Sequence, residues 1–276
     1  MTEDLNVNCR WGNAFVKKYI GDESVVPIVA IHGWLDNCAS FSFLSPLLKN
    51  SVYAVDLPGH GKSSHLPDGS WYHFIDYVEK FHEIISGLKL NKFILLGHSM
   101  GAAISVIYSA TFPENVSKLV MIDGLGPLVN DPAEAPEKFK EAILSRESSI
   151  KRQRRPFDSL VTASKLRQSV GGLSIKSARE LVKQQIIKKT DGYYWSYDPK
   201  LNFKSSLRMT PEQLKAFYAQ LTVPTLLIKA SDGILKQINC QKYLNKCHVS
   251  EIELKGNHHL HMDNPTATAT EINKFL

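Results

Sequence analysis

The sequence lacks a cysteine framework. Its 4 cysteines, Cys9, Cys38, Cys240 and Cys247, are scattered and contain no C-x-x-C pair. Four cysteines could form two disulfides, but their spacing does not indicate the paired framework that small secreted domains use as a scaffold. We therefore expect free and mostly buried thiols in a reducing compartment.

Long hydrophobic runs are also missing. No apolar stretch reaches the ~18 residues that a membrane span needs, so we expect no transmembrane segment. The first residues, Met1 to Arg10, are acidic and polar, which is not the pattern of a signal peptide. The C-terminus, Asn273-Lys274-Phe275-Leu276, is not a peroxisomal address of the Ser-Lys-Leu type. We therefore expect a cytoplasmic protein.

Positive charge is concentrated in one part of the chain. The net charge is +6, but residues 138–208 carry 17 Lys and Arg against 6 Asp and Glu, a balance of +11. Such a segment either makes peripheral contact with anionic surfaces or forms a solvated helical surface. Its most basic run, Lys151-Arg152-Gln153-Arg154-Arg155, has no interleaved aromatics. No nucleic-acid motif is present either, so we expect no nucleic-acid partner.

Short β-rich runs alternate with longer helical ones, which predicts an α/β fold with a mostly parallel sheet flanked by helices. Strands are predicted over 27–31, 52–55, 92–96, 118–122, 225–228 and 249–254, and helices over 72–88, 100–112 and 265–276. The alternation stops between 131 and 220, where the pattern favours several helices. We interpret residues 127–221 as an inserted helical lid on a core of residues 1–126 and 222–276.

One motif carries nucleophilic chemistry. Gly97-His98-Ser99-Met100-Gly101 matches G-x-S-x-G, and it follows a predicted strand and opens a predicted helix. A serine on this tight turn is pushed out of the sheet, and the helix start places free N–H groups beneath it. The glycines on either side give the neighbouring chain room to approach. We expect Ser99 to be the nucleophile.

A serine needs a general base, and the order of residues in this fold places that base downstream. The histidines available there are His248, His258, His259 and His261. A metal site is the rival interpretation of this cluster, but no carboxylate stands nearby at ligand spacing. The run His82-Glu83-Ile84-Ile85-Ser86 also fails the H-E-x-x-H pattern at its last position. We therefore expect no metal and no organic cofactor.

The sequence resembles the α/β-hydrolase superfamily, and more narrowly its serine hydrolase-like, or kraken-like, branch. The resemblance runs from about residue 12 to the C-terminus. Besides the serine motif it rests on His32-Gly33-Trp34-Leu35-Asp36-Asn37, Asp56-Leu57-Pro58-Gly59-His60-Gly61-Lys62-Ser63-Ser64, Leu119 to Pro127 and Gly256-Asn257-His258-His259-Leu260-His261-Met262.

The resemblance implies roles for particular residues. Proteins of this kind place the catalytic histidine seven residues before a proline that opens the last helix, and counting back from Pro265 gives His258. The oxyanion hole is implied at the backbone N–H groups of Trp34 and Met100. His259 and His261 are then structural or lid-facing, although a slip of one residue would make His259 the base.

The acid is where the sequence departs from the commonest pattern of the superfamily. Most relatives place it as Gly-x-x-Asp after the strand at 225–228, but here Gly233 occupies that slot and Asp232 stands one residue early. Some relatives carry the acid one strand earlier, where this chain has Asp123. The kraken-like branch resembles the second arrangement. We prefer Asp123 and keep Asp232 as the alternative acid.

These residues lead us to expect a serine hydrolase that cleaves small carboxylic esters through an acyl-enzyme. A thioester hydrolase or a carbon–carbon bond hydrolase would use the same triad. A non-catalytic scaffold that binds a ligand or a partner is the alternative from another class. The serine at position 99 speaks against epoxide hydrolases and haloalkane dehalogenases, because those relatives attack with an aspartate.

Overall fold

The computed structural model describes residues 1–150, 154–244 and 249–276. Cys247, His248 and the first three residues of the basic run at 151–155 lie outside the described residues. The described cysteines, Cys9, Cys38 and Cys240, are free thiols. No helix in the described part of the chain is long and apolar enough to cross a bilayer.

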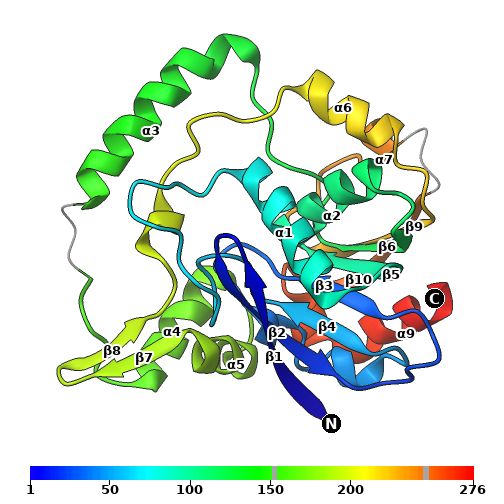
Figure 1. The fold of residues 1–276 in the computed structure, drawn as a ribbon, viewed down its shortest axis with the longest axis horizontal. Helices are drawn as coiled ribbons and strands as arrows, with labels where there is room; N and C mark the ends of the chain where they lie inside the picture. The colour runs from blue at the N-terminus through cyan, green and yellow to red at the C-terminus, as the bar shows by residue number, and fades with distance from the viewer. Residues whose placement is uncertain (151–153, 245–248) are drawn as a thin grey trace.

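A single large sheet forms the centre of the molecule (Figure 1). Among the described residues it has 8 strands in the order β1-β2-β4-β3-β5-β6-β9-β10. The strands from β4 to β10 in this order pair in parallel, and β1 and β2 form an antiparallel hairpin at one edge. Their bounds are β1 Thr2–Cys9, β2 Gly12–Tyr19, β3 Ile28–Ile31, β4 Val52–Val55, β5 Phe93–His98, β6 Val116–Ile122, β9 Thr225–Asp232 and β10 Val249–Asn257.

Helices cover both faces of this sheet. The helices α1 (Phe74–Leu88) and α2 (Met100–Thr111) pack on one face, and α9 (Pro265–Phe275) packs on the other. Successive side chains of a strand point to opposite faces, so β5 serves both layers. Leu95 contributes to the core beneath α1 and α2, whereas Ile94 and Leu96 contribute to the core beneath α9. The expected α/β fold is confirmed.

The spacing of apolar residues explains α1. Its buried residues recur at steps of three and four, which places them on one face of a helix: Tyr77, Val78, Phe81, Ile84 and Ile85. The helix ends at Lys89, which adopts a left-handed conformation with φ of 55°. The predicted helix over 72–88 is therefore right to within two residues.

The chain between β6 and β9, which we call the β6–β9 connection, holds most of the remaining elements (Figure 1). Its helices are α3 Ala135–Ile150, α4 Leu160–Gly171, α5 Ile175–Gln185 and α6 Pro211–Ala219, with short 3₁₀ helices at Pro132–Glu134 and Pro199–Asn202. The shorter helices α7 (Gln241–Leu244) and α8 (Leu260–Asp263) follow β9 and β10, and the 3₁₀ turns Cys38–Phe41 and Ser45–Leu47 follow β3.

Two hairpins were not expected from the sequence. One is β1–β2 at the N-terminus. The other pairs β7 (Ile186–Lys189) with β8 (Gly192–Trp195) inside the β6–β9 connection, where only helices were predicted. The β-branched pair Ile186-Ile187 and the aromatic run 193–195 favour strands, and Gly192 has a φ of 142° after the tight turn. The prediction of helix was therefore wrong for these ten residues.

Candidate active site

Ser99 stands on the turn between β5 and α2. Its backbone has a φ of 52° and a ψ of −115°, outside the regions that non-glycine residues favour. Such a conformation costs on the order of 1–3 kcal/mol and persists only where the surrounding structure enforces it. The strained turn lifts the Ser99 side chain out of the end of the sheet. It also places the first N–H groups of α2, which lack helical acceptors, around the serine.

Close packing explains the glycines of the motif. A Cβ at Gly101 would overlap the backbone carbonyl of Ile31 on the neighbouring strand. A Cβ at Gly97 would overlap the backbone of Ala102 in the first turn of α2. Only glycine lets β3, β5 and α2 approach each other this closely, so the motif is a packing requirement as well as a local turn.

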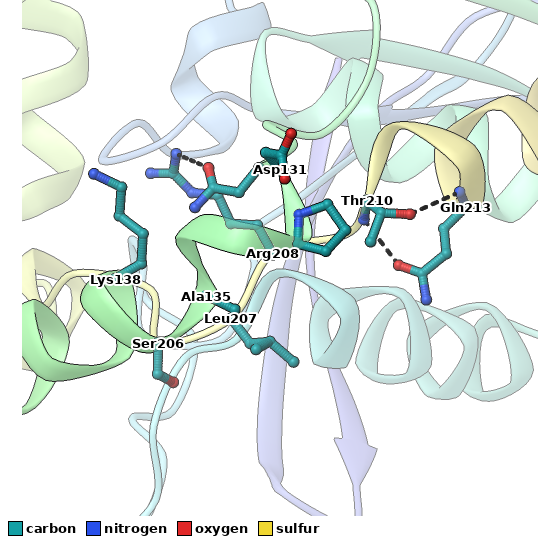
Figure 2. Close-up of a pocket in the computed structure, with 10 residues that line it drawn as sticks. Asp131, Ala135, Lys138, Ser206, Leu207, Arg208, Thr210 and Gln213 are labelled. Atoms are coloured by element: carbon teal, nitrogen blue, oxygen red, sulfur yellow. Dashed lines mark hydrogen bonds between the residues drawn. The ribbon is translucent and has the colours of Figure 1, made fainter.

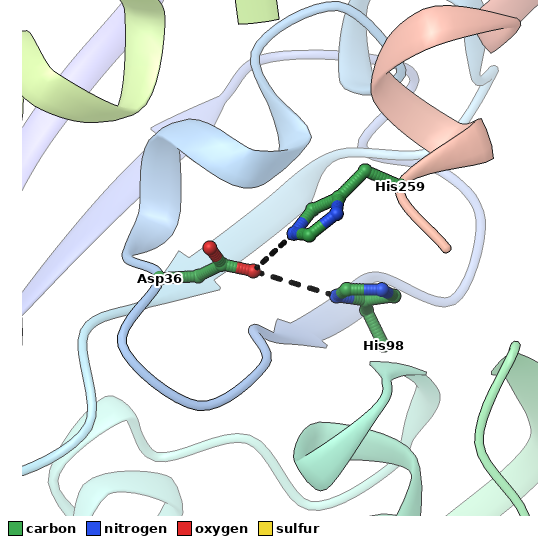
Figure 3. Close-up of side chains that lie close together, drawn as sticks. All are labelled: Asp36, His98 and His259. Carbon is green, nitrogen blue, oxygen red and sulfur yellow. Dashed lines mark hydrogen bonds and ion pairs between the residues drawn. The ribbon is translucent and has the colours of Figure 1, made fainter. Parts of the chain in front are cut away.

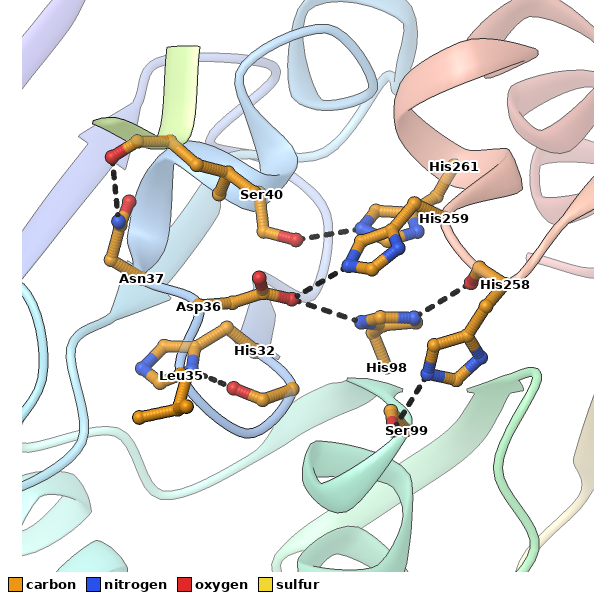
Figure 4. Close-up of polar contacts among 12 residues, drawn as sticks. His32, Leu35, Asp36, Asn37, Ser40, His98, Ser99, His258, His259 and His261 are labelled. Atoms are coloured by element: carbon orange, nitrogen blue, oxygen red, sulfur yellow. Dashed lines mark hydrogen bonds and ion pairs between the residues drawn. The ribbon is translucent and has the colours of Figure 1, made fainter. Parts of the chain in front are cut away.

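A continuous hydrogen-bonded chain runs through the side chains of Ser99, His258 and Asp123. The His258 Nδ1 atom lies 2.6 Å from Oδ2 of Asp123, and its Nε2 atom lies 2.9 Å from Oγ of Ser99. Because an ionised carboxylate only accepts, Nδ1–H of His258 donates to Asp123. The lone pair of Nε2 is then free to accept the Ser99 proton. Figure 4 shows the Ser99–His258 contact.

Asp123 is fully buried at the end of β6. Burial by itself would raise the pKa of this carboxyl, but hydrogen bonds from His258 and from the Ile234 amide hold its pKa below the usual value. The Ile234 N–H donates to Oδ2 at 2.8 Å, and the Ala230 N–H donates to Oδ1 at 3.3 Å. The carboxylate therefore stays anionic at neutral pH while it faces the imidazole.

Asp232, the alternative acid, is not part of this chain of contacts. Its side chain is 66% exposed and accepts a hydrogen bond from Lys236 Nζ at 2.8 Å. The Ser231 hydroxyl donates to its other oxygen. The structure therefore brings Asp123, and not Asp232, to the imidazole of His258.

The two expected oxyanion donors lie on adjacent loops. Trp34 follows β3, and Met100 is the first residue of α2, directly after Ser99. The strands that carry these loops are neighbours, with Ile31 paired to Gly97. The Met100 N–H lies at a helix start, where it has no intrahelical acceptor. Both residues thus follow the carboxyl ends of neighbouring strands, the same end of the sheet that carries Ser99.

The remaining histidines of the predicted site have structural contacts. His32 is fully buried, with Nδ1–H donating to the Gly33 carbonyl and Nε2 accepting from the Leu57 N–H. One neutral tautomer satisfies both bonds, so His32 braces the loop after β3. His261 Nε2 lies 2.7 Å from the Ser40 hydroxyl, and His259 contacts the carboxylate of Asp36 (Figure 4).

Three residues near the serine have contacts that sequence reasoning missed. They are Asp36 after β3, His98 in the serine motif and Arg167 in α4. Asp36 and His98 stand inside the motifs that carry the resemblance, and that position was the only available signal. Arg167 is 131 residues from Asp36 along the chain. No local pattern could have indicated their contact.

A pocket of about 200 Å³ opens within the β6–β9 connection (Figure 2). Its walls come from the chain around the start of α3 and the chain leading into α6, including Asp131, Lys138 and Arg208. None of the side chains that line it belongs to the Ser99–His258–Asp123 chain. This pocket is therefore separate from the serine.

A match to a protein-family model identifies the family of this chain. Residues 26–265 match the model of the alpha/beta hydrolase fold. The chain belongs to the α/β-hydrolase family.

Within that family the chain groups with serine hydrolase-like proteins. It is 30% identical to a serine hydrolase-like protein of Danio rerio, over 91% of this chain and 81% of the relative. It is 33% identical to a probable serine hydrolase of Drosophila melanogaster, over 99% of this chain and 87% of the relative. The crystal structure of a hypothetical protein of Pseudomonas aeruginosa superposes with a TM-score of 0.92 at 31% identity, covering 99% of this chain and 97% of that chain.

Proposed function

We propose that this α/β-hydrolase cleaves carboxylic esters through an acyl-enzyme, with Ser99 as nucleophile, His258 as general base and Asp123 as the acid that orients the base. The supporting observation is the unbroken contact chain from Ser99 Oγ through the imidazole to a buried, anionic carboxylate. Its donor pattern leaves the lone pair of His258 Nε2 directed at the serine hydroxyl.

In the first step Ser99 Oγ attacks the ester carbonyl carbon while its proton passes to Nε2 of His258. The carbonyl oxygen gains the negative charge, which the N–H groups of Trp34 and Met100 stabilise. Removing one such donor typically costs ~3 kcal/mol of transition-state stabilisation. His258 then donates its proton to the leaving alcohol oxygen as the C–O bond breaks, which leaves Ser99 acylated.

The second step repeats this chemistry with water. His258 takes a proton from a water molecule, and the water oxygen attacks the acyl carbon. The tetrahedral intermediate collapses, the bond to Ser99 Oγ breaks and the proton returns from His258 to the serine. The carboxylic acid leaves, and the enzyme is ready for the next ester. The chain's own side chains perform every proton transfer in this scheme.

We propose that residues 127–221 are a lid that bounds the substrate site, inserted into a core of residues 1–126 and 222–276. Figure 1 supports this role, because the segment leaves the core after β6 and arches beside the sheet before returning at β9. Several large apolar side chains of the segment are exposed: Leu128, Phe139, Ile143, Leu144 and Leu207. Exposed apolar side chains on such a segment would suit the acyl part of a small-molecule ester if the segment covers the site.

Many basic side chains of this segment already have partners. Lys138 and Lys204 pair with Glu141, and Lys183 pairs with Glu180. We propose that these side chains form a solvated helical surface, because acidic side chains of the same segment partly neutralise their charges.

A fluorophosphonate probe and a series of p-nitrophenyl esters of increasing acyl length test the proposed activity. The probe should label the native protein, and Ser99→Ala should abolish both labelling and ester hydrolysis while the fold remains intact. His258→Ala should lose hydrolysis as well, because no base remains to take the serine proton. Ser250→Ala, on the exposed edge strand β10, is the matched control and should behave as the native protein.

Three results would contradict parts of this proposal. Hydrolysis by Ser99→Ala within tenfold of the native rate would overturn the assignment of the nucleophile. Native protein that neither reacts with the probe nor hydrolyses any ester would favour a binding scaffold. Labelling of Ser99 without ester hydrolysis would direct the search to thioesters or carbon–carbon bonds, which the same triad can cleave.

A further inference from the structure

A second cluster of charged and titratable side chains lies beside the triad. It consists of Asp36, His98, His259 and Arg167, and we call it the Asp36 cluster. The Asp36 side chain is 1% exposed and meets Nε2 of His259 at 3.3 Å and Nδ1 of His98 at 3.6 Å (Figure 3). Its other oxygen accepts a hydrogen bond from Arg167 Nη2. A carboxylate this deeply buried needs such partners, because an unpaired one would be strongly destabilising.

The carboxylate of Asp36 remains ionised. Burial alone would raise the pKa of this carboxyl, but His259 and Arg167 hold it well below its usual range. Burial also lowers the pKa of His98 to about 4, so this imidazole is neutral at neutral pH. Its Nε2–H then donates to the His258 carbonyl at 2.8 Å, so Nδ1 of His98 carries a lone pair and donates no hydrogen bond to Asp36.

The members of the cluster are the chain neighbours of the predicted catalytic groups. His98 directly precedes Ser99, and His259 directly follows His258. Asp36 lies two residues after Trp34 on the loop that follows β3. One carboxylate therefore faces neighbours of the nucleophile and of the base, and it shares a loop with an oxyanion donor. Figure 4 shows how these side chains converge.

The fourth member comes from the β6–β9 connection. Arg167 belongs to α4, and the following helix α5 binds the same loop through its backbone and side chains. Gln185 Nε2 donates to the carbonyls of Leu35 and Asp36 at 2.7 and 3.0 Å. Asn37 Nδ2 donates to the Leu181 carbonyl at 3.0 Å. The two helices thus hold the loop after β3 from outside the core.

A metal ion is the alternative occupant of this cluster. One ligand atom from each of Asp36, His98 and His259 lies within 4.8 Å of the others. Arg167 contradicts that interpretation, because its guanidinium occupies one oxygen of Asp36 and lies 3.5 Å from His259 Nε2. A divalent cation at the same place would be repelled by this fixed positive charge.

We propose that Asp36 and Arg167 are positioning residues that couple the docking of α4 to the alignment of the nucleophile, base and oxyanion loops. This inference rests on the proposed function for its kinetic effects. Arg167 pairs with one oxygen of Asp36, and the other oxygen of Asp36 contacts His259, so this carboxylate joins α4 to the loop after β3 and to His259. Loss of either residue lets the three loops shift relative to each other. Misplacement of about 1 Å can cost on the order of a hundredfold in rate.

Steady-state kinetics of Asp36→Asn, Arg167→Met, Arg167→Lys and the double variant Asp36→Asn/Arg167→Met test the proposal. Each single charge removal should lower kcat by about tenfold to a hundredfold and leave KM within about threefold. Arg167→Lys should recover part of the loss, because lysine keeps the charge without the planar fork. The double variant leaves no unpaired buried charge, and it should lose no more than Asp36→Asn alone.

The matched control is Lys165→Met, which removes an exposed cation from the same helix and should keep native kinetics. Values of kcat within twofold of native in both single variants would overturn the proposal, as would a change confined to KM. Zn²⁺ binding by the native protein that disappears in Asp36→Asn would also overturn it.

Hydrogen exchange separates this inference from the proposed function. In Asp36→Asn the amides of α4 should lose protection, whether or not the protein hydrolyses esters. Unchanged exchange in α4 would overturn the coupling. A native protein without esterase activity whose α4 loosens in Asp36→Asn would count against the proposed function and leave the docking contact standing.

Discussion

The turns that end β6 and β9 carry the same two residues and differ in what their aspartates do. Asp123-Gly124 follows β6, and Asp232-Gly233 stands at the end of β9. The two strands are parallel neighbours, with Ile122 paired to Ile228. Asp123 is fully buried against His258, whereas the Asp232 side chain is 66% exposed and pairs with Lys236. Sequence chemistry alone cannot separate the two.

The space between the turns explains the difference. A Cβ built at Gly233 would overlap the carboxylate of Asp123. A side chain at position 233 would therefore enter the space that the Asp123 carboxylate fills. The β9 turn contributes through its backbone, since Ala230 and Ile234 donate N–H groups to Asp123. We infer that a carboxylate in this space could orient the imidazole whichever of the two strands supplied it.

The largest effect should follow from Asp123→Asn. A neutral amide accepts through one oxygen only, turns an NH2 group toward a donor, and brings no charge to stabilise the imidazolium, so kcat should fall by at least about a hundredfold. Burst or steady-state measurements with a p-nitrophenyl ester check this, with a melting curve as the control for folding. A loss of less than threefold would remove Asp123 from the triad.

Moving the acid from the turn after β6 to the turn after β9 tests whether the two turns are interchangeable. Asp123→Gly is compatible with the φ of 40° at this position and should be nearly inactive. Adding Gly233→Asp places a carboxylate in the vacated space, and we expect it to recover about tenfold in kcat. In the native background Gly233→Asp should instead lower activity, because two carboxylates would compete for one place. No recovery in the double variant would show that the turns are not interchangeable.

The smallest effect should come from Asp232→Asn. This side chain contacts Lys236 and Ser231 at the surface, and exposed ion pairs contribute little. We expect kcat and KM within about twofold of native, measured beside Asp123→Asn as the same substitution on the neighbouring strand. A hundredfold loss in Asp232→Asn would reverse the assignment of the two turns.

Whether an element could be predicted from the sequence depends on how close together along the chain the residues are that stabilise it. The helix at 74–88 and the strands at 52–55 and 93–98 depend on apolar periodicity, which is local and readable. The hairpin β7–β8 was missed because its ten residues lie in a segment whose surroundings read as helical. Its strand preference comes from β-branched and aromatic residues that a helix also tolerates.

Within the site, the groups that depend on local geometry could be predicted from the sequence. The glycines around Ser99 are required by the turn, and the spacing from Pro265 indicated His258 within the family pattern. For the carboxylate at His258, the family resemblance favoured Asp123 over Asp232, but the contact itself is visible only in the tertiary structure. Asp123 and Asp232 are chemically identical, and the register of β6 against β9 determines which one is buried.

The contact between Asp36 and Arg167 also exists only in the folded chain. The two residues are 131 positions apart, so no periodicity or short motif joins them. The sequence shows an acidic residue in the loop after β3 and a basic residue in a charged helix, which by themselves suggest solvated surface. Their burial against each other results from the docking of α4 on the core. In these surroundings of low dielectric constant the two opposite charges attract each other more strongly than they would in water, which makes their contact specific.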